Sequence, residues 1–327
     1  MATRIKDDLY DEAAELALQH RVKAGYVVED EAEMTPRYRE VVTNTMHIAA
    51  DLEMMTLPVY HPALLEAPTL EDRIAVAAAI QDELGHAQVM YRMLEDFGYD
   101  TVELLFERDP AEFRTFYMIE HPQHDYIECC VAMLLGDRAG YTTTRDLEEN
   151  CSFGPYARSL RKVNFEEQWH VGHGERWVKF FWNHSPETRK RVQKYVDFIF
   201  PMSAMWFGVP DLMKKRTDQL AYKIRGASND EMRQRWLTEV VPYCEQVGID
   251  IPAHFDKDRN EYVLDFVPPI LLNEDTGIWD YTTVTWEEKF AQWRKGGRNK
   301  VAALERLQGE CWGKEFWAGN SDTGIET

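Results

Sequence analysis

The chain has 327 residues, a formal net charge of −20 and 44% hydrophobic residues. Such an acidic balance argues against a nucleic-acid-binding protein, which needs excess Lys and Arg to contact phosphates. No hydrophobic run approaches the roughly 20 residues that span a membrane, and residues 1–20 lack the apolar core of a signal peptide. The five cysteines show no zinc-type spacing and fit a protein of the reducing cytoplasm.

Helical signals follow one another along the first two thirds of the chain. Pro58 ends the second of these helices, and a loop is predicted through His61, Pro62 and Pro68. Thr69 is suited to cap the third helix. The helices are predicted over residues 5–20, 36–57, 70–96, 124–148 and 155–183, with another beginning at Ser185-Pro186.

Prolines and glycines interrupt the chain around residues 201–210, and the pattern beyond them is mixed. Helices are predicted over 212–225, 229–247 and 284–313, a strand over 261–267 with a partner near 279–285, and a disordered tail over 320–327. The fold class is therefore all-α. We expect three parts: an N-terminal helical segment (1–34), a four-helix bundle (35–205) and a helical C-terminal extension with a role in interactions (206–327).

Two Glu-x-x-His motifs lie 84 positions apart in the chain. They are Glu83 to His86 and Glu167 to His170. Each motif has an acid 30 positions upstream, Glu53 for the first and Asp137 for the second. Six side chains of metal-ligand type thus form two matching sets of three.

The spacing within each motif places both side chains on one helical face, because residues i and i+3 lie one turn apart. Two such helices, with one further acid from each of two others, make a carboxylate-bridged dinuclear metal site in a four-helix bundle. Carboxylate and imidazole ligands suit iron, with manganese as the alternative. Glu53 and Asp137 are the ligands expected to change their mode of coordination during catalysis, because neither has a His partner on its own helix.

One Glu-x-x-His is expected by chance in a chain of this size, so the motifs alone also fit surface acids. The surrounding residues favour a buried site, since apolar side chains share the helical faces of these acids, where an unpaired charge is costly. Glu128 is the alternative to Asp137 on the same predicted helix, but it breaks the 30-residue offset. Asp82 and Glu166 also repeat at 84, and are either orienting partners of the imidazoles or solvated acids.

Aromatic residues give weaker signals. The cluster Trp169, Trp177, Phe180, Phe181 and Trp182 fits either internal packing or the lining of a substrate or subunit surface. Tyr141, one turn past Asp137, is a candidate for a position near the metals.

Read in context, the motifs resemble the catalytic subunit of the ring-1,2-phenylacetyl-CoA epoxidase family. The resemblance spans roughly residues 34–270. It is carried by residues 38–53, Ala67-Pro68-Thr69-Leu70, Gln81-Asp82-Glu83-Leu84-Gly85-His86, Leu135-Gly136-Asp137, residues 152–158, Glu166-Glu167-Gln168-Trp169-His170, residues 229–235, Val241-Pro242, Gly248 and residues 252–256.

The resemblance implies a ferritin-like fold in which the same six residues are di-iron ligands. It also implies a monooxygenase that inserts one oxygen atom of the co-substrate O2 into the aromatic ring of an aryl-CoA thioester. The implied partners are a metal-free helical sister subunit, small accessory subunits and an iron–sulfur/flavin reductase, so the chain is expected to work in an oligomeric complex. The chain departs from the family at Ala77-Ala78-Ala79-Ile80, which lacks the basic residue that the phenylacetyl-CoA enzymes show there, and in residues 99–125.

Three other functions fit parts of the pattern. They are a ribonucleotide-reductase-like radical protein, a ferritin-like iron store and a non-catalytic scaffold subunit. The long Trp-rich C-terminal region argues against an iron store, and the complete ligand set argues against a scaffold. An oxygenase would draw its electrons from another protein, because the chain has no Gly-x-Gly-x-x-Gly fingerprint and no cysteine cluster for a flavin or an iron–sulfur cluster.

Overall fold

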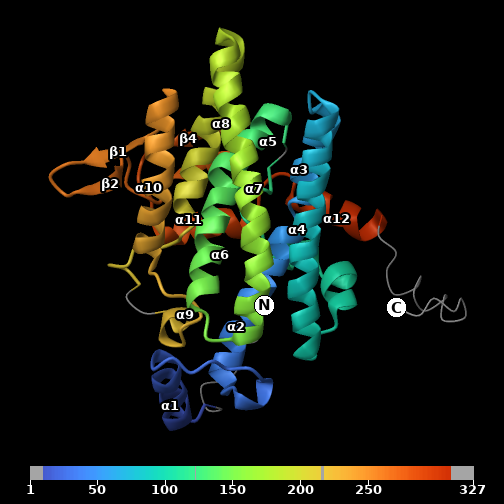
Figure 1. Ribbon diagram of the computed structural model, residues 1–327, viewed down its shortest axis with the longest axis vertical. Coiled ribbons are helices and arrows are strands. Elements are labelled where there is room, and N and C mark those ends of the chain that lie inside the picture. The colour runs from blue at the N-terminus through green and yellow to red at the C-terminus, as the bar shows by residue number, and fades with distance from the viewer. Residues whose placement is uncertain (1–9, 122, 215–216, 311–327) are drawn as a thin grey trace, which may run out of the picture.

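Long helices run side by side through the middle of the molecule and form a bundle (Figure 1). This computed structural model describes residues 10–121, 123–214 and 217–310. Three members of the bundle are α2 (Pro36–Met54), α4 (Leu70–Asp96) and α7 (Gly154–His184). The fourth is composite, with α5 (Tyr126–Ala132), a π-helical turn (Met133–Asp137) and α6 (Arg138–Asn150) in one line. α2 packs on α4, the composite helix packs on α7, and α4 contacts α7, which confirms the predicted all-α four-helix bundle.

Side-chain caps mark where some of the helices begin. The Thr69 hydroxyl accepts a hydrogen bond from the Asp72 backbone N–H at 3.1 Å, at the start of α4. Ser228 caps α10 (Asn229–Val247) in the same way, and Gly248 ends that helix in the left-handed conformation at φ +89°. These two helices have the predicted bounds.

The composite helix lies close to α7 at the end of α5 and in the π-helical turn. A Cβ added at Gly174 would lie 2.7 Å from the Cys130 carbonyl oxygen and 2.7 Å from the Leu134 nitrogen, so only glycine permits this approach. A π turn adds one residue to a helical turn and is common at functional sites. Here it ends at Asp137, one of the candidate ligands.

The hydrophobic core is divided into two clusters along the bundle. On α4, one cluster ends at Ala79 and the other begins at Ala87. On α7, the clusters lie on either side of the stretch between Val163 and Val178. The two Glu-x-x-His motifs occupy the layer between the clusters.

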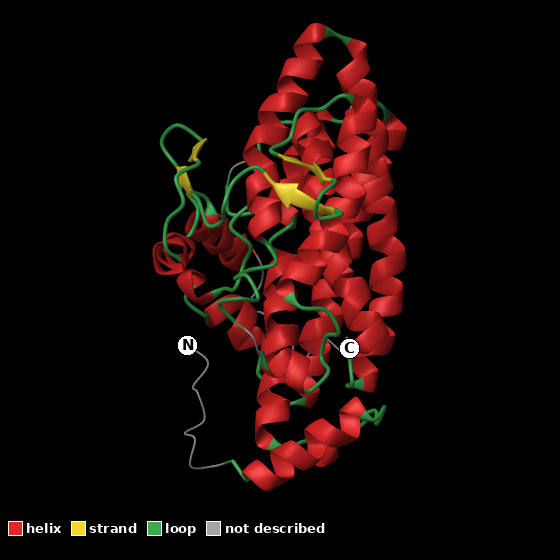
Figure 2. Cartoon of the chain, turned by 90° about the vertical axis from the view of Figure 1, so that its left-hand side faces the viewer, coloured by secondary structure: helices red, strands yellow, loops and turns green. Residues whose placement is uncertain are grey.

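The remaining elements surround the bundle (Figure 1). α3 packs on α4 and α5, α8 packs on α7 and α5, and α10 packs on α6. The short strands pair as two antiparallel hairpins, β1 with β2 and β3 with β4, beside the helices (Figure 2). The bounds are α1 (Glu12–Lys23), α3 (Leu57–Glu66), α8 (Pro186–Met205), α9 (Asp218–Ala221), β1 (Ala253–Asp256), β2 (Glu261–Leu264), β3 (Leu271–Asn273), β4 (Ile278–Asp280), α11 (Trp286–Lys295) and α12 (Lys300–Glu310), with short 3-10 or π turns at Glu31–Glu33, Glu103–Glu107 and Pro110–Glu112.

Several sequence predictions were wrong in detail. The loop predicted through His61 and Pro62 is mostly the helix α3, since Pro58 stands in its first turn, where proline fits a helix, and Pro62 is accommodated inside it. Of the helix predicted over 212–225, the described residues contain only the four residues of α9. The helix predicted over 284–313 is broken at Gly296-Gly297, where Gly296 has φ +79°.

The strand pairing was also predicted wrongly. β2 lies within the predicted strand 261–267, but its partner is β1, which precedes it, and residues 278–280 pair with β3 instead. The helix predicted over 5–20 is found at Glu12–Lys23. The predicted disordered tail, 320–327, lies outside the described residues. The three-part domain division stays a prediction. Of the helices described, none combines the length and the apolar character needed to cross a membrane.

Candidate metal centre

The six candidate ligands meet in the layer between the two core clusters. Glu53 comes from α2, Asp137 from the end of the π turn, and the two Glu-x-x-His motifs from α4 and α7. Their ligand atoms form two overlapping groups, and within each group one atom per residue lies within 4.8 Å of all the others. One group holds Glu53, Glu83, His86 and Glu167, and the other holds Glu83, Asp137, Glu167 and His170. Glu83 and Glu167 belong to both groups, so each would be a shared ligand if two metal ions were bound.

Burial makes this cluster unfavourable without cations. Glu83 and Glu167 are only 2% and 6% exposed. Burial, together with the negative charges of Glu167 and Glu53, raises the pKa of Glu83 well above its usual value. Burial and the charge of Glu167 likewise raise the pKa of Asp137 to about 7. Divalent cations at this position would offset the mutual repulsion of the carboxylates.

The two imidazoles point one nitrogen each at these carboxylates. His86 Nδ1 lies 3.5 Å from Glu167 and 3.7 Å from Glu53, and His170 Nδ1 lies 3.2 Å from Glu83. Both Nδ1 atoms are buried and have no hydrogen-bond partner. Buried polar atoms are rarely left unpaired, so each Nδ1 is available to a ligand that the carboxylates also bind. The donor set of carboxylate oxygens and imidazole nitrogens fits iron or manganese.

The other nitrogen of each imidazole is held by an acid from the opposite helix. Glu166 on α7 contacts His86 Nε2 at 3.0 Å, and Asp82 on α4 contacts His170 Nε2 at 3.4 Å. The sequence predicted that Asp82 and Glu166 could orient the imidazoles but not that the pairs would cross between α4 and α7. An acid at Nε2 keeps that nitrogen protonated and leaves Nδ1 free for a metal.

Tyr60 is a site residue that the sequence analysis missed. Its hydroxyl donates a hydrogen bond to Asp137 Oδ2 at 2.6 Å, and its side chain is 1% exposed. It lies on α3, in the segment predicted as a loop, so the pattern gave no reason to place it in the core. Pro58 at the start of a helix was the signal that could have revealed it.

Other candidates lie away from the cluster. Glu128 is buried, but its carboxylate accepts a hydrogen bond from the His124 backbone N–H at 2.7 Å and belongs to neither ligand group. Tyr141 does not line the cavity beside the ligands and has the Arg145 guanidinium over its ring at 5.3 Å. In the aromatic cluster, Trp177 stacks on Phe181 and both are partly buried, while Trp169 is 68% exposed.

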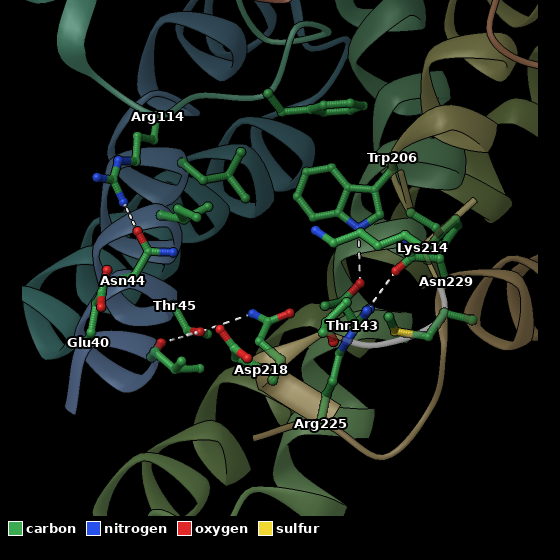
Figure 3. Close-up of a pocket in the computed structure, with 18 of the residues that line it drawn as sticks. Glu40, Asn44, Thr45, Arg114, Thr143, Trp206, Lys214, Asp218, Arg225 and Asn229 are labelled. Carbon is green, nitrogen blue, oxygen red and sulfur yellow. Dashed lines mark hydrogen bonds between the residues drawn. The ribbon is translucent and has the colours of Figure 1, made fainter. Parts of the chain in front are cut away.

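A cavity opens from the carboxylates toward the protein surface. This inner cavity has a volume of about 190 Å³, and its lining includes Glu53, Glu83, Asp137 and Glu167 among mostly apolar side chains. A larger outer cleft of about 910 Å³ adjoins it (Figure 3). The cations lining the outer cleft are Arg37, Arg114, Lys214 and Arg225. A ligand with an apolar end for the inner cavity and an anionic end for the outer cleft fits these two spaces.

Comparison with known proteins relates most of the chain to one protein family. Residues 8–268, which include all six candidate ligands, match the family model described as phenylacetic acid catabolic protein. The chain is 25% identical over 297 residues to one of the subunits of the 1,2-phenylacetyl-CoA epoxidase of Escherichia coli (strain K12). That alignment covers 89% of this chain and 95% of the relative.

Proposed function

Because the chain belongs to the phenylacetic acid catabolic protein family, we propose that it is the di-iron subunit of a multicomponent aryl-CoA monooxygenase. The observation that carries the proposal is the pair of overlapping ligand groups, with two unpartnered Nδ1 atoms, at the end of an apolar cavity. The relative named as an epoxidase component supports the choice of reaction.

Each metal ion would have its own terminal ligands. Glu53 and His86 would serve one ion, Asp137 and His170 the other, and Glu83 and Glu167 both. Two bound iron ions would supply the redox chemistry that activates O2. Glu53 and Asp137 would be the ligands that change their coordination, because each is the sole ligand from its helix. Manganese remains the alternative, because the same donor set suits it.

The chain's own residues would orient the ligands and exclude water. Glu166 and Asp82 fix the two imidazole rings through Nε2, and Tyr60 holds one oxygen of Asp137. The two core clusters close the site along the bundle axis, which leaves the inner cavity as the way in. Exclusion of water protects a reactive oxidant from side reactions.

The substrate we propose is an aryl-CoA thioester. Its ring would enter the inner cavity, and its CoA part would lie in the outer cleft near Arg37, Arg114 and Lys214. One oxygen atom of O2 would form the ring epoxide, and the other would leave as water with two electrons and two protons from outside. The segment Ala77 to Ile80, where the family's basic residue is missing, lines neither space, so in this chain the cations come from elsewhere.

The electrons would come from a separate iron–sulfur/flavin reductase. With a net charge of −20, the chain offers acidic surface to a basic partner, and salt should weaken that attraction. A helical sister subunit, together with small accessory subunits, completes the proposed complex.

Metal analysis followed by turnover tests this function. Protein loaded anaerobically with ferrous iron should bind about two ions per chain. With a supplied reductase, the complex should convert members of a panel of aryl-CoA thioesters to products that carry one ¹⁸O atom from ¹⁸O2. Saturation at or below one iron per chain contradicts the dinuclear site. Product from this chain alone, with only NADPH and O2, contradicts the need for a reductase.

Tyr60 gives a specific reason to test the radical-protein alternative. A tyrosine that donates a hydrogen bond to a metal-ligating carboxylate is placed for one-electron oxidation. If the protein is ribonucleotide-reductase-like, the iron-loaded and oxygenated chain should show a stable tyrosyl radical spectrum that the Tyr60→Phe variant lacks. The monooxygenase proposal expects no stable radical in either protein.

A further inference from the structure

The inner cavity and the outer cleft meet at a neck, which we define as the residues that line both spaces. Arg225 is the one charged side chain among the described residues of the neck, and also the one cation of the inner-cavity lining. An acyl chain that passes from the cleft through this neck to the carboxylates passes Arg225. The neck consists of Thr45, Ile48, Leu52, Phe116, Thr143, Trp206, Gln219 and Arg225.

The loop that carries Arg225 is fixed to the bundle. Arg225 lies between α9 and α10, and the adjacent Ile224 N–H donates to the Gln219 carbonyl at 2.7 Å. On its other side, the Gly226 and Ala227 N–H groups donate to the carboxylate of Asp146 at 2.7 and 3.1 Å. Asp146 is fully buried on α6. The backbone of Arg225 is therefore held in place before any ligand binds.

The guanidinium of Arg225 has an unused donor. The side chain is 7% exposed, and its Nη2 donates to Asn229 Oδ1 at 2.7 Å, a bond drawn in Figure 3. Its Nε is buried and has no hydrogen-bond partner. A buried, charged N–H without an acceptor is costly, so an acceptor supplied by a ligand would be strongly favoured.

The surrounding acids do not accept a hydrogen bond from this Nε–H. Burial lowers the pKa of Arg225, and the carboxylates that counteract the effect are those of Asp146 and Asp211. Asp146 itself is hydrogen-bonded to the two backbone N–H groups after Arg225 and to the Arg235 guanidinium at 2.8 Å. Neither acid lines the inner cavity. The protein therefore provides no hydrogen-bond acceptor for the Nε–H of Arg225.

We propose that Arg225 binds the thioester carbonyl oxygen of the acyl substrate through Nε–H and so fixes the carbonyl at the neck. This inference rests on the proposed function and deepens it. With the ring in the inner cavity and the CoA chain in the outer cleft, the thioester is the polar group of the substrate that lies at their junction. Arg225 is then a positioning residue, which sets the distance between the carbonyl and the ring and selects for acyl thioesters.

A carbonyl-deletion experiment tests this assignment. The probes are phenylacetyl-CoA and its thioether analogue S-(2-phenylethyl)-CoA, which has the same ring and CoA but no carbonyl. Dissociation constants are measured on the iron-loaded complex without reductant, so that no turnover occurs. Wild type should bind the thioester on the order of tenfold more tightly than the thioether, since a hydrogen bond to a charged donor is at stake. In Arg225→Met this ratio should fall to about one.

The matched control is Lys214→Met, a cation of the outer cleft outside the neck, which should weaken both probes alike and keep the ratio. Arg225→Lys keeps a charged N–H donor at the position and should retain part of the thioester-to-thioether ratio. If it does, the lost ratio of Arg225→Met reflects the missing donor and not a damaged loop. Equal binding of both probes by wild type, or an unchanged ratio in a folded Arg225→Met, overturns the role of Arg225 while acyl-CoA binding stands. If neither probe binds wild type, the proposed substrate fails and the inference fails with it.

Discussion

The two halves of the candidate site are built in different ways. The metal half, formed by the Glu-x-x-His motifs of α4 and α7, is nearly symmetric: each helix provides one Glu, one His and one acid that holds the other helix's imidazole. The proposed substrate half, formed by the neck, has no such symmetry and combines side chains from α2, α6 and α9 with Phe116, Trp206 and Arg225, which lie outside the helices. The metal half is encoded by local helical spacing, while the neck depends on how distant segments pack.

This difference separates the expected effects of mutations. Changes in the metal half should alter metal content first and activity as a consequence. Changes in the neck should alter substrate binding and leave metal content intact. A variant that fails to follow this division would show that the two halves are coupled.

The largest effect is expected for the shared ligands. Glu83→Ala or Glu167→Ala removes a carboxylate that belongs to both ligand groups, so each should abolish stable loading of two irons and reduce turnover to background. Iron analysis after anaerobic loading and desalting measures the first effect, and product formation measures the second. Glu128→Ala is the matched control, because Glu128 is buried on the same composite helix as Asp137 but bonds to His124. Loss of iron in Glu128→Ala with retention in Asp137→Ala would mean that the ligand on this helix has been misassigned.

A smaller effect is expected for the acids that hold the imidazoles. Glu166→Gln and Asp82→Asn each replace the acceptor at one Nε2, and such changes typically weaken metal affinity by roughly 10–100-fold. Competition with a chelator would measure the affinity of each variant. Glu71→Gln, an exposed acid of α4, is the control and should bind iron as wild type does. Wild-type affinity in both test variants would mean that the crossed pairs do not support metal binding.

The contrast between the halves also explains what the sequence could predict. The six candidate ligands could be chosen because i and i+3 spacing and a common 84-residue offset are visible in one dimension. The structure brings those six together, with the four motif residues nearly fully buried. The crossing of Asp82 and Glu166 could not be predicted, because it depends on how α4 and α7 face each other.

The neck was beyond prediction for a physical reason. Phe116 lies in an irregular segment, and Arg225 follows a helix of only four residues where fourteen were predicted. Their positions depend on long-range bonds such as those from Asp146 to the loop after α9, and no periodicity reports such bonds. Tyr60 was missed because prolines on both sides were interpreted as breaks in the chain, although one of them begins α3.

The neck can be disturbed without touching the metal half. A Cβ at Gly226 would lie 2.4 to 2.6 Å from the side-chain atoms of Asn150, so Gly226→Ala should push the Arg225 loop away from α6. Overpacking of this kind typically costs about 1–3 kcal/mol, and we expect a KM for the thioester raised by about tenfold with unchanged iron content. Adding Asn150→Ala removes the clash and should recover much of the loss. An unchanged KM in Gly226→Ala would show that the loop position does not matter for substrate binding.

The smallest effect on the site is expected at Lys289, which belongs to neither half. This lysine is fully buried on α11, and its Nζ lies 4.8 to 5.5 Å from the ring centroids of Trp279, Tyr117 and Trp293. The same Nζ donates a hydrogen bond to Gln292 Oε1 at 3.0 Å. Burial lowers the pKa of Lys289 to about 7 from its usual 10.5.

The sign of the pH dependence follows from that depressed pKa. Between pH 7 and 10.5 the unfolded chain binds a proton at Lys289 that the folded chain does not, so stability rises with pH across this window. The free energy of unfolding should therefore increase by about 2 kcal/mol between pH 7 and pH 9 from this residue alone. Lys289→Met, which keeps an unbranched side chain one atom shorter and removes the charge, should lack this part of the gradient and leave iron loading unchanged. Urea unfolding of both proteins at the two pH values measures it. Identical gradients would mean that Lys289 stays protonated among the three aromatic rings and is stabilised by cation–π contacts instead.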